Sequence, residues 1–237
     1  MNLVGNVTLC LYVRAYWRRL SFSLSSLVQG DFRGRVRITF LRDDPYLSES
    51  EEVKRLFGGL LDLDWTDLPG WEKGVTTRKW TRTKSLARTN DIGCCPGWIL
   101  WSRPDMVYHP TFFSELEAEV QGIAESCVVS WPRYTMSQES GDRLLLPGAS
   151  FYECAYDSAV PHVTGFSGGR FRRICGAGYA QLVQRSWLND LGIQEYSRQR
   201  GSIGDRAFRG KVGRLHRFLP TNPPIHLQHD RIDANPK

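Results

Sequence analysis

The chain has 237 residues, a formal net charge of +6 and 41% hydrophobic residues, a composition that excludes wholesale disorder. No apolar run approaches the roughly 20 residues that span a bilayer, and the N-terminus lacks the pattern of a secretory signal. The six cysteines contain no CxxC pair. We therefore expect a cytoplasmic protein with reduced thiols, and a peripheral contact with a membrane surface stays open.

Positive charge is concentrated in the C-terminal third. Between Arg170 and Arg217 there are eleven Arg or Lys residues and three acidic residues, so this segment has eight excess positive charges. The rest of the chain has two excess negative charges. The basic segment either meets an anionic partner or lies open to solvent.

The first 60 residues predict an alternation of strands and helices. Residues 7–13 are almost all apolar, as in a strand covered on both faces, and residues 16–28 place leucines at helical spacing. Residues 36–41 predict a second strand. Ser48 and Glu51 predict a capping box at the start of the next helix. Two apolar strands joined by an amphipathic helix indicate a right-handed parallel βαβ unit.

The alternation continues after a connector rich in Trp and Thr. We expect a helix over residues 84–90, a strand over 97–101, a helix over 111–124 and a strand over 127–131. This order predicts one α/β domain of Rossmann-like type, with a mostly parallel central sheet flanked by helices. The Pro- and Asn-containing region from Pro220 onward is expected to be a C-terminal tail.

Carboxylates follow two of the predicted strands. Asp43 and Asp44 come after the strand over 36–41, and Asp105 comes after the strand over 97–101. Open α/β sheets bind ligands beyond the carboxyl ends of their strands, so these acids are candidate site residues. Turn formation is the alternative reading, because Asp before Pro is a common turn former.

Two motif-bearing segments lie between Asp44 and the middle of the chain. The first reads Lys84-Ser-Leu-Ala-Arg-Thr-Asn-Asp-Ile-Gly93, and the second reads Gly97-Trp-Ile-Leu-Trp-Ser-Arg-Pro-Asp105. In this order, after the opening strand and helix, they resemble a GT-A glycosyltransferase of family 2. The first segment is similar to the helix beneath the donor diphosphate. The second is similar to the strand that leads into the metal-binding DxD motif.

The second half of the chain extends the resemblance to His229. Cys175-Gly-Ala-Gly178 and the following Arg185-Ser-Trp187 are similar to the acceptor-side segment of the family. Leu191-Gly-Ile-Gln-Glu195 resembles its GG-x-x-E stretch. Gly204-Asp205 falls where the family carries an ED pair, and His226-Leu-Gln-His229 resembles the late histidines that complete a metal site.

The resemblance implies a transferase that moves a sugar from a nucleotide-diphosphate donor to a hydroxyl acceptor, with inversion and an Asp base. The acceptor is a glycan, a lipid-linked molecule or another hydroxyl compound, and the basic segment favours an anionic one. It implies a divalent cation, Mn or Mg, at the leaving diphosphate. It also implies a GT-A domain over 1–219, with a nucleotide-sugar-binding half at 1–125 and an acceptor half at 126–219, followed by the tail at 220–237.

The resemblance assigns roles to individual side chains. The catalytic base is Asp205. The donor-binding residues are Arg14, Asp43, Asp44, Lys84, Arg88, Asn90, Arg103 and Asp105. The acceptor-binding residues are Gly178, Trp187 and Glu195. The metal ligands are Asp105, His226 and His229.

Two positions depart from the family pattern. Arg103 stands where the first acid of the DxD motif is expected, and Gly204 replaces the Glu of the ED pair. A guanidinium beside a diphosphate can itself supply positive charge through paired hydrogen bonds. The metal is therefore either bound weakly by Asp105 and a histidine or dispensed with.

Other readings stay open. A degenerate GT-A-like domain that binds a nucleotide or glycan without turnover is consistent with Arg103 and Gly204. A nucleic-acid-binding protein is suggested by the arginine cluster, but no zinc-finger, RNP or heptad pattern accompanies it, so we expect no nucleic-acid partner. Asp205 has several arginines nearby in sequence and is alternatively a surface ion-pair partner. His226 and His229 are alternatively part of an exposed tail.

Overall fold

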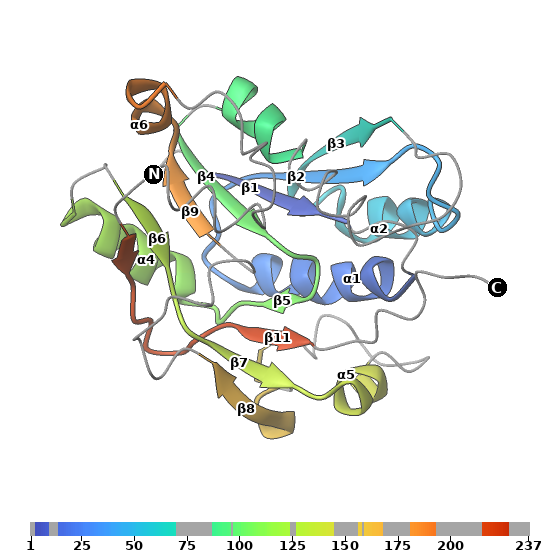
Figure 1. The fold of residues 1–237 in the computed structure, drawn as a ribbon. Coiled ribbons are helices and arrows are strands. Elements are labelled where there is room, and N and C mark those ends of the chain that lie inside the picture. The colour runs from blue at the N-terminus through green and yellow to red at the C-terminus, as the bar shows by residue number, and fades with distance from the viewer. Residues whose placement is uncertain are drawn as a thin grey trace, which may run out of the picture.

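The computed structural model describes residues 3–9, 14–69, 87–95, 97–123, 127–144, 156–157, 159–167, 181–192 and 215–227. All structural statements below concern these residues. Figure 1 shows their arrangement. The first elements are β1 (Leu3–Thr8), α1 (Arg14–Gln29), β2 (Gly34–Leu41), α2 (Glu49–Phe57), β3 (Asp62–Leu68), β4 (Trp98–Ser102), β5 (Met106–Val107) and α4 (Phe112–Gln121). The later ones are β6 (Val128–Ser130), β7 (Arg133–Met136), α5 (Gln138–Leu144), η1 (Val160–His162), β8 (Val163–Ser167), β9 (Gln181–Gln184), α6 (Arg185–Asp190), β10 (Leu215–Arg217) and β11 (Ile225–Leu227).

The central sheet has seven strands in the order β10-β6-β9-β4-β1-β2-β3. β1 pairs in parallel with both β2 and β4, and β2 pairs in parallel with β3. β9 is antiparallel to its neighbours β4 and β6. This confirms the prediction of a mostly parallel sheet flanked by helices. Strands from both predicted halves of the domain join this one sheet, and the boundary at residue 125 stays a prediction.

The first strand begins earlier than the apolar run suggested. β1 covers Leu3–Thr8, where the sequence predicted a strand over residues 7–13. Gly5 and Asn6 interrupt the hydrophobic pattern, yet Asn6 is fully buried because its side chain has polar partners within the fold. Residues 10–13 lie outside the described residues.

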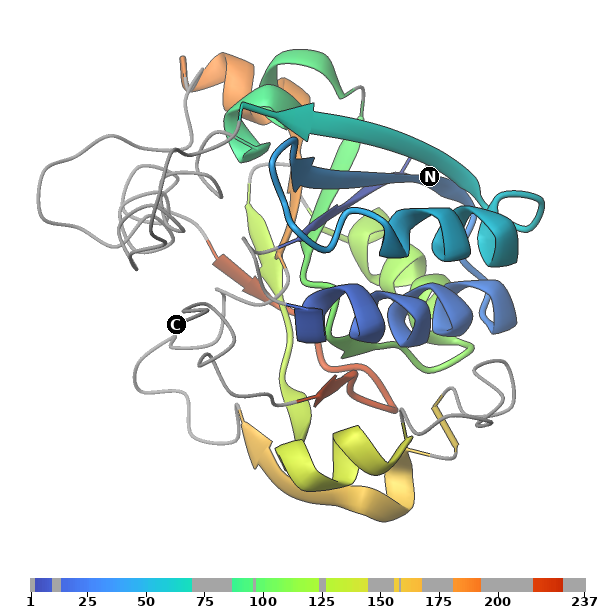
Figure 2. The same ribbon diagram turned by 90° about the vertical axis from the view of Figure 1, so that its right-hand side faces the viewer.

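Helix α1 lies between two sheets and is buried on nearly all sides (Figures 1 and 2). Leu20 and Leu24 belong to the hydrophobic cluster of the central sheet, whereas Phe22 packs with residues of the second sheet. The serines between them, which read as a polar face, are also buried. The predicted amphipathic helix is therefore an interior helix with a polar stripe inside the protein.

A second sheet of four strands, in the order β5-β11-β7-β8, was not predicted. β11 pairs in parallel with β7 and antiparallel with β5, and all three of its residues are buried. The prediction of a tail from Pro220 onward is therefore wrong for residues 225–227. Ile225 and Leu227 are apolar side chains that this sheet buries beside Phe22.

The predicted capping box at the start of α2 is also wrong. Ser48 has helical backbone angles and makes no side-chain capping bond, and Glu51 instead pairs with Lys54 at 2.8 Å. The preceding backbone already forms turn hydrogen bonds. The N–H of Glu49 donates to the carbonyl of Tyr46, and the N–H of Ser50 donates to the carbonyl of Leu47. The helix thus continues an existing turn and does not start from an extended cap residue.

In the described part of the chain, no helix combines the length and the apolar character that crossing a membrane requires.

Candidate functional site

Four side chains meet beyond the carboxyl end of β4, and we call them the Asp105 cluster: Tyr16, Arg103, Asp105 and His226. Tyr16 comes from the first turns of α1, and His226 comes from β11 of the second sheet. Arg103 and Asp105 directly follow β4. The backbone N–H of Leu227 donates to the carbonyl of Asp105 at 2.9 Å, which fixes β11 against this turn. This confirms the prediction that Asp105 lies just past a strand end.

Arg103 is held by two hydrogen bonds. Its Nη2 donates to Oδ2 of Asp105 at 2.7 Å and to the hydroxyl of Tyr16 at 2.6 Å. The guanidinium carbon lies 5.5 Å from the centre of the Tyr16 ring. The Asp105 side chain is 0% exposed and that of Arg103 is 12% exposed. These contacts fix the planar guanidinium beyond the carboxyl end of β4.

His226 completes the cluster. Its Nε2 lies 3.2 Å from Oδ2 of Asp105, the same oxygen that Arg103 contacts. Burial lowers the pKa of His226, against the opposing effect of Asp105, and the positive charges of Arg103 and Arg133 lower it further. The imidazole is therefore neutral near pH 7. The structure thus brings together Asp105 and His226, two residues that the resemblance assigned to one site.

The Asp105 cluster does not fit a divalent cation in its present arrangement. Such an ion prefers several oxygen ligands, and no group of three His, Cys, Asp or Glu side chains that could hold a metal occurs in the described ranges. The Arg103 guanidinium would repel a divalent ion about 4 Å away by roughly 8 kcal/mol at an effective dielectric constant of 20, which offsets the attraction that the Asp105 carboxylate would supply. The predicted Mn or Mg ion stays a prediction, and no step below is routed through it.

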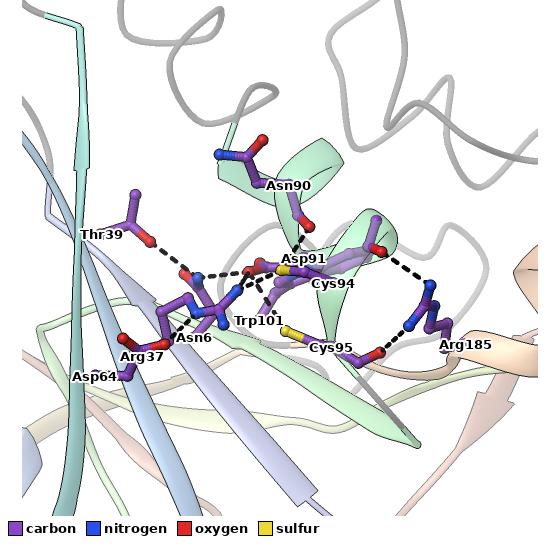
Figure 3. Close-up of polar contacts among 11 residues, drawn as sticks. Asn6, Arg37, Thr39, Asp64, Asn90, Asp91, Cys94, Cys95, Trp101 and Arg185 are labelled. Atoms are coloured by element: carbon purple, nitrogen blue, oxygen red, sulfur yellow. Dashed lines mark hydrogen bonds and ion pairs between the residues drawn. The ribbon is translucent and has the colours of Figure 1, made fainter.

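A second polar group lies on one face of the central sheet (Figure 3), and we call it the Asp91 network: Asn6, Arg37, Thr39, Asp91 and Trp101. Asp91 is on the helical segment 87–94, and the other four side chains come from β1, β2 and β4.

Asp91 accepts hydrogen bonds from two strands and pairs with an arginine of a third. Trp101 Nε1 donates to its Oδ2 at 2.8 Å, and Asn6 Nδ2 donates to its Oδ1 at 2.9 Å and to Thr39 Oγ1 at 3.0 Å. Arg37 Nη1 lies 3.5 Å from the same Oδ1. Burial raises the pKa of Asp91 to about 7, although Trp101, Arg37 and Asn6 oppose this rise. The network therefore holds the helical segment against the sheet, although burying the Asp91 carboxylate is unfavourable.

The end of this helical segment is fixed by Arg185 of α6. Its guanidinium donates to the carbonyl oxygens of Gly93 and Cys95 at 2.8 and 3.2 Å. A cation at the carbonyl end of a helix satisfies acceptors that have no partner within the helix. The segment expected to lie beneath the donor diphosphate is thus held both through Asp91 and at its end.

The acids after β2 form a turn. The backbone N–H of Tyr46 donates to Oδ1 of Asp44 at 2.9 Å, and the N–H of Leu47 donates to its carbonyl at 3.1 Å. Asp44 is buried and Asp43 is exposed. The turn reading is therefore confirmed for Asp44, and the donor-binding role of both acids stays a prediction.

Other predicted site residues have packing roles. Arg88 is 2% exposed, and its guanidinium lies 5.0 Å from the centre of the Trp101 ring. Trp187 is 8% exposed and belongs to a hydrophobic cluster with Val4 and Ile99. Asn90 is exposed, and its backbone carbonyl accepts a bond from the Cys94 thiol. These contacts account for Arg88 and Trp187 as interior residues, and their ligand-binding roles stay predictions.

The remaining predicted residues cannot be placed. Arg14 is the first residue of α1. The positions outside the described residues are Lys84, Gly178, Glu195, Asp205 and His229.

Sequence reasoning missed Tyr16, Asn6 and Asp91. Asn6 in an otherwise apolar strand was a signal, since a polar side chain in a doubly covered strand needs a buried partner. Asp91 directly follows Asn90 in the helix motif, and no local pattern marks it as buried. Tyr16 reads as one more apolar position of α1, and only the fold brings its hydroxyl to Arg103.

Comparison with known proteins gives similarity at the level of structure. No protein-family model and no curated protein sequence matches the chain. The structure of S. aureus TarS 1-349 is similar to it with a TM-score of 0.63 and 13% sequence identity, covering 95% of this chain and 60% of that chain. A longer TarS structure gives 0.62 and 13%, with 95% and 36% covered. TarS 1-349 in complex with UDP gives 0.62 and 12%, with 95% and 60% covered.

The chain thus spans less than two thirds of these TarS structures, and an identity of 12–13% shows the fold alone. TarS is a GT-A glycosyltransferase of family 2. The seven-stranded, mostly parallel sheet, with Asp105 just beyond the carboxyl end of β4, is therefore a GT-A fold.

Proposed function

We propose that the chain is a glycosyltransferase that moves a sugar from a nucleotide-diphosphate donor to a hydroxyl acceptor. The observation that carries this proposal is the Asp105 cluster beyond the carboxyl end of β4, since open α/β sheets generally bind ligands at the carboxyl ends of their strands. The UDP complex of TarS, a protein with the same fold, supports a nucleoside diphosphate as the leaving group.

The reaction breaks the bond between the anomeric carbon and a phosphate oxygen, and the electron pair leaves with that oxygen. The acceptor oxygen forms the new bond to the anomeric carbon and loses its proton to a base. We assign this base to Asp205, on the resemblance of Gly204-Asp205 to the ED pair. A carboxylate on the face opposite the leaving group gives inversion.

A thermal-shift screen with UDP-, GDP- and dTDP-sugars tests donor binding. Stabilisation by one donor class is expected, because a ligand that binds the folded state raises the melting temperature. Release of the nucleoside diphosphate, with and without candidate glycan acceptors, then tests turnover. A protein that none of the three donor classes stabilises, with or without manganese, contradicts the proposal.

A non-catalytic domain that binds a nucleotide or glycan is the second candidate. Arg103 and Gly204 favour it, since both replace acids that the resemblance places in the catalytic machinery. Donor-dependent stabilisation without any release of nucleoside diphosphate would support this second candidate. Detectable donor hydrolysis in the absence of an acceptor would eliminate it.

Binding to DNA or RNA that falls steeply with salt, without any effect of nucleotide sugars, would point instead to a nucleic-acid partner.

A further inference from the structure

Arg103 occupies the position of an expected acid and is built into the site. Its Nη2 contacts both Asp105 and Tyr16, so the guanidinium has a fixed position at the end of β4. The pair with Asp105 brings the positive charge beside the carboxylate that would otherwise bind a cation. The position that the resemblance gives to the first acid of the metal-binding motif is therefore held by a fixed cation.

A second guanidinium acts on the Asp105 cluster. Arg103 pairs with Asp105 at 2.7 Å, and the same carboxylate oxygen lies 3.2 Å from His226. A second guanidinium, that of Arg133 at the start of β7, also acts electrostatically on His226. Two guanidinium groups thus act on the Asp105 cluster, and phosphate oxygens are ligands that guanidinium groups bind well.

From this arrangement we infer that the leaving diphosphate is stabilised by the guanidinium of Arg103 and not by a divalent cation. The inference rests on the proposed function and specifies its chemistry. The planar fork of a guanidinium donates two parallel hydrogen bonds to phosphate oxygens, where a metal would bridge them. Asp105 and Tyr16 are then positioning residues that orient Arg103, and Asp105 is not a metal ligand.

The test measures binding of UDP, GDP and dTDP by calorimetry to the full chain, in EDTA and in manganese. For the nucleotide that binds, we expect wild-type dissociation constants that agree within about threefold between the two conditions. Arg103→Ala should weaken binding at least about tenfold in both, because it removes a charge-assisted contact. Arg55→Ala, an exposed arginine that pairs with Glu52 on α2, is the matched control and should bind like wild type.

Arg103→Asp restores an acid at the first position of the motif and should bind nucleotide more tightly in manganese than in EDTA. Tyr16→Phe keeps the ring but removes the hydroxyl, and should weaken binding by a few fold without metal dependence. If wild-type binding disappears in EDTA and returns with manganese, the inference is overturned while the proposed function stands. If no nucleotide binds in either condition, the proposed function fails and the inference fails with it.

Discussion

The Nη2 atom of Arg103 lies 2.7 Å from Oδ2 of Asp105, in a part of the protein where the carboxylate has no exposed surface. Two ions buried together stabilise a fold modestly, but removing one of them leaves the other charge without compensation. The pair is therefore a sensitive point of the structure as well as of the site.

Asp105→Asn should lower the free energy of unfolding by about 3 kcal/mol, because the Arg103 guanidinium would lose its buried counter-ion. Urea denaturation measures this change. Asp67→Asn is the control, since its pair with Arg42 is exposed and its loss should cost less than about 1 kcal/mol. Equal effects of the two substitutions would contradict the assignment of Asp105 to a buried pair.

Asp91 makes stability depend on pH. Its pKa is raised from 3.8 to about 7 in the folded protein, mainly by burial, so the folded state binds this proton more tightly than the unfolded state. The stability tied to the protonated acid is present below pH 4 and is lost as the pH rises through 7. Relative to Asp91→Asn, the wild type should lose roughly 4 kcal/mol of unfolding free energy over this range.

Unfolding curves of both proteins between pH 4 and 8 measure this difference, and the subtraction removes the contribution of the other carboxyl groups. A wild type that gains stability relative to Asp91→Asn as the pH rises would show the opposite shift. In that case the bonds from Trp101, Asn6 and Arg37 would outweigh the effect of burial.

Arg185→Ala should destabilise the helical segment 87–94 by about 1 kcal/mol, because the carbonyls of Gly93 and Cys95 lose their donors. Hydrogen exchange should become faster at the backbone amides of this segment and should stay unchanged in α2. Uniform acceleration in both helices would indicate a global effect and not the loss of a local cap.

Gly34→Ala should cost about 1–3 kcal/mol of stability. A Cβ at this position would lie 2.2 Å from the carbonyl oxygen of Leu3, which is backbone of the neighbouring strand and cannot move aside. Gly59→Ala is the control, since nothing lies within 4 Å of a Cβ there. Thermal unfolding of both variants compares the two positions, and similar melting temperatures would contradict the close approach of β1 and β2.

Asp205→Asn should abolish sugar transfer while nucleotide binding stays within about twofold of wild type, because general-base catalysis requires the carboxylate and donor binding does not. Asp190→Asn, an acid at the end of α6, is the comparison variant. Transfer assays and calorimetry on the same preparations separate the two properties. Transfer that survives in Asp205→Asn means that another group is the base.

The predicted strands overlap β1, β2, β4 and β6 of the seven-stranded central sheet and no strand of the second sheet. β4 is a buried, largely apolar run, and β2 alternates arginines with the buried Val36 and Ile38, so both patterns indicated strands. Two aspartates of β3, Asp62 and Asp64, pair with arginines of β2. In the sequence, such a polar segment looks like part of a connector. The strands of the second sheet have two to five residues each, and such short segments carry no clear period.

The site divides in a similar way. Asp105 and His226 were identified because a motif resemblance named them, although they are far apart in the chain. The hydrogen bond from Arg103 to Tyr16 depends on how α1 packs against the central sheet, and no sequence pattern predicts that packing. The burial of Arg88 and Trp187 also depends on the fold, and no local pattern in the sequence indicated it.

The position of β9 has a consequence for how the chain folds. β9 lies between β4 and β6 and bonds to both, although it follows them much later in the chain. The strands β1 to β4 can pair as one contiguous N-terminal unit, whereas β6 and β10 join it only through β9. Such long-range pairing raises contact order and slows folding. We expect the N-terminal unit to form first during synthesis, with the edge of β4 open until Gln181–Gln184 arrives.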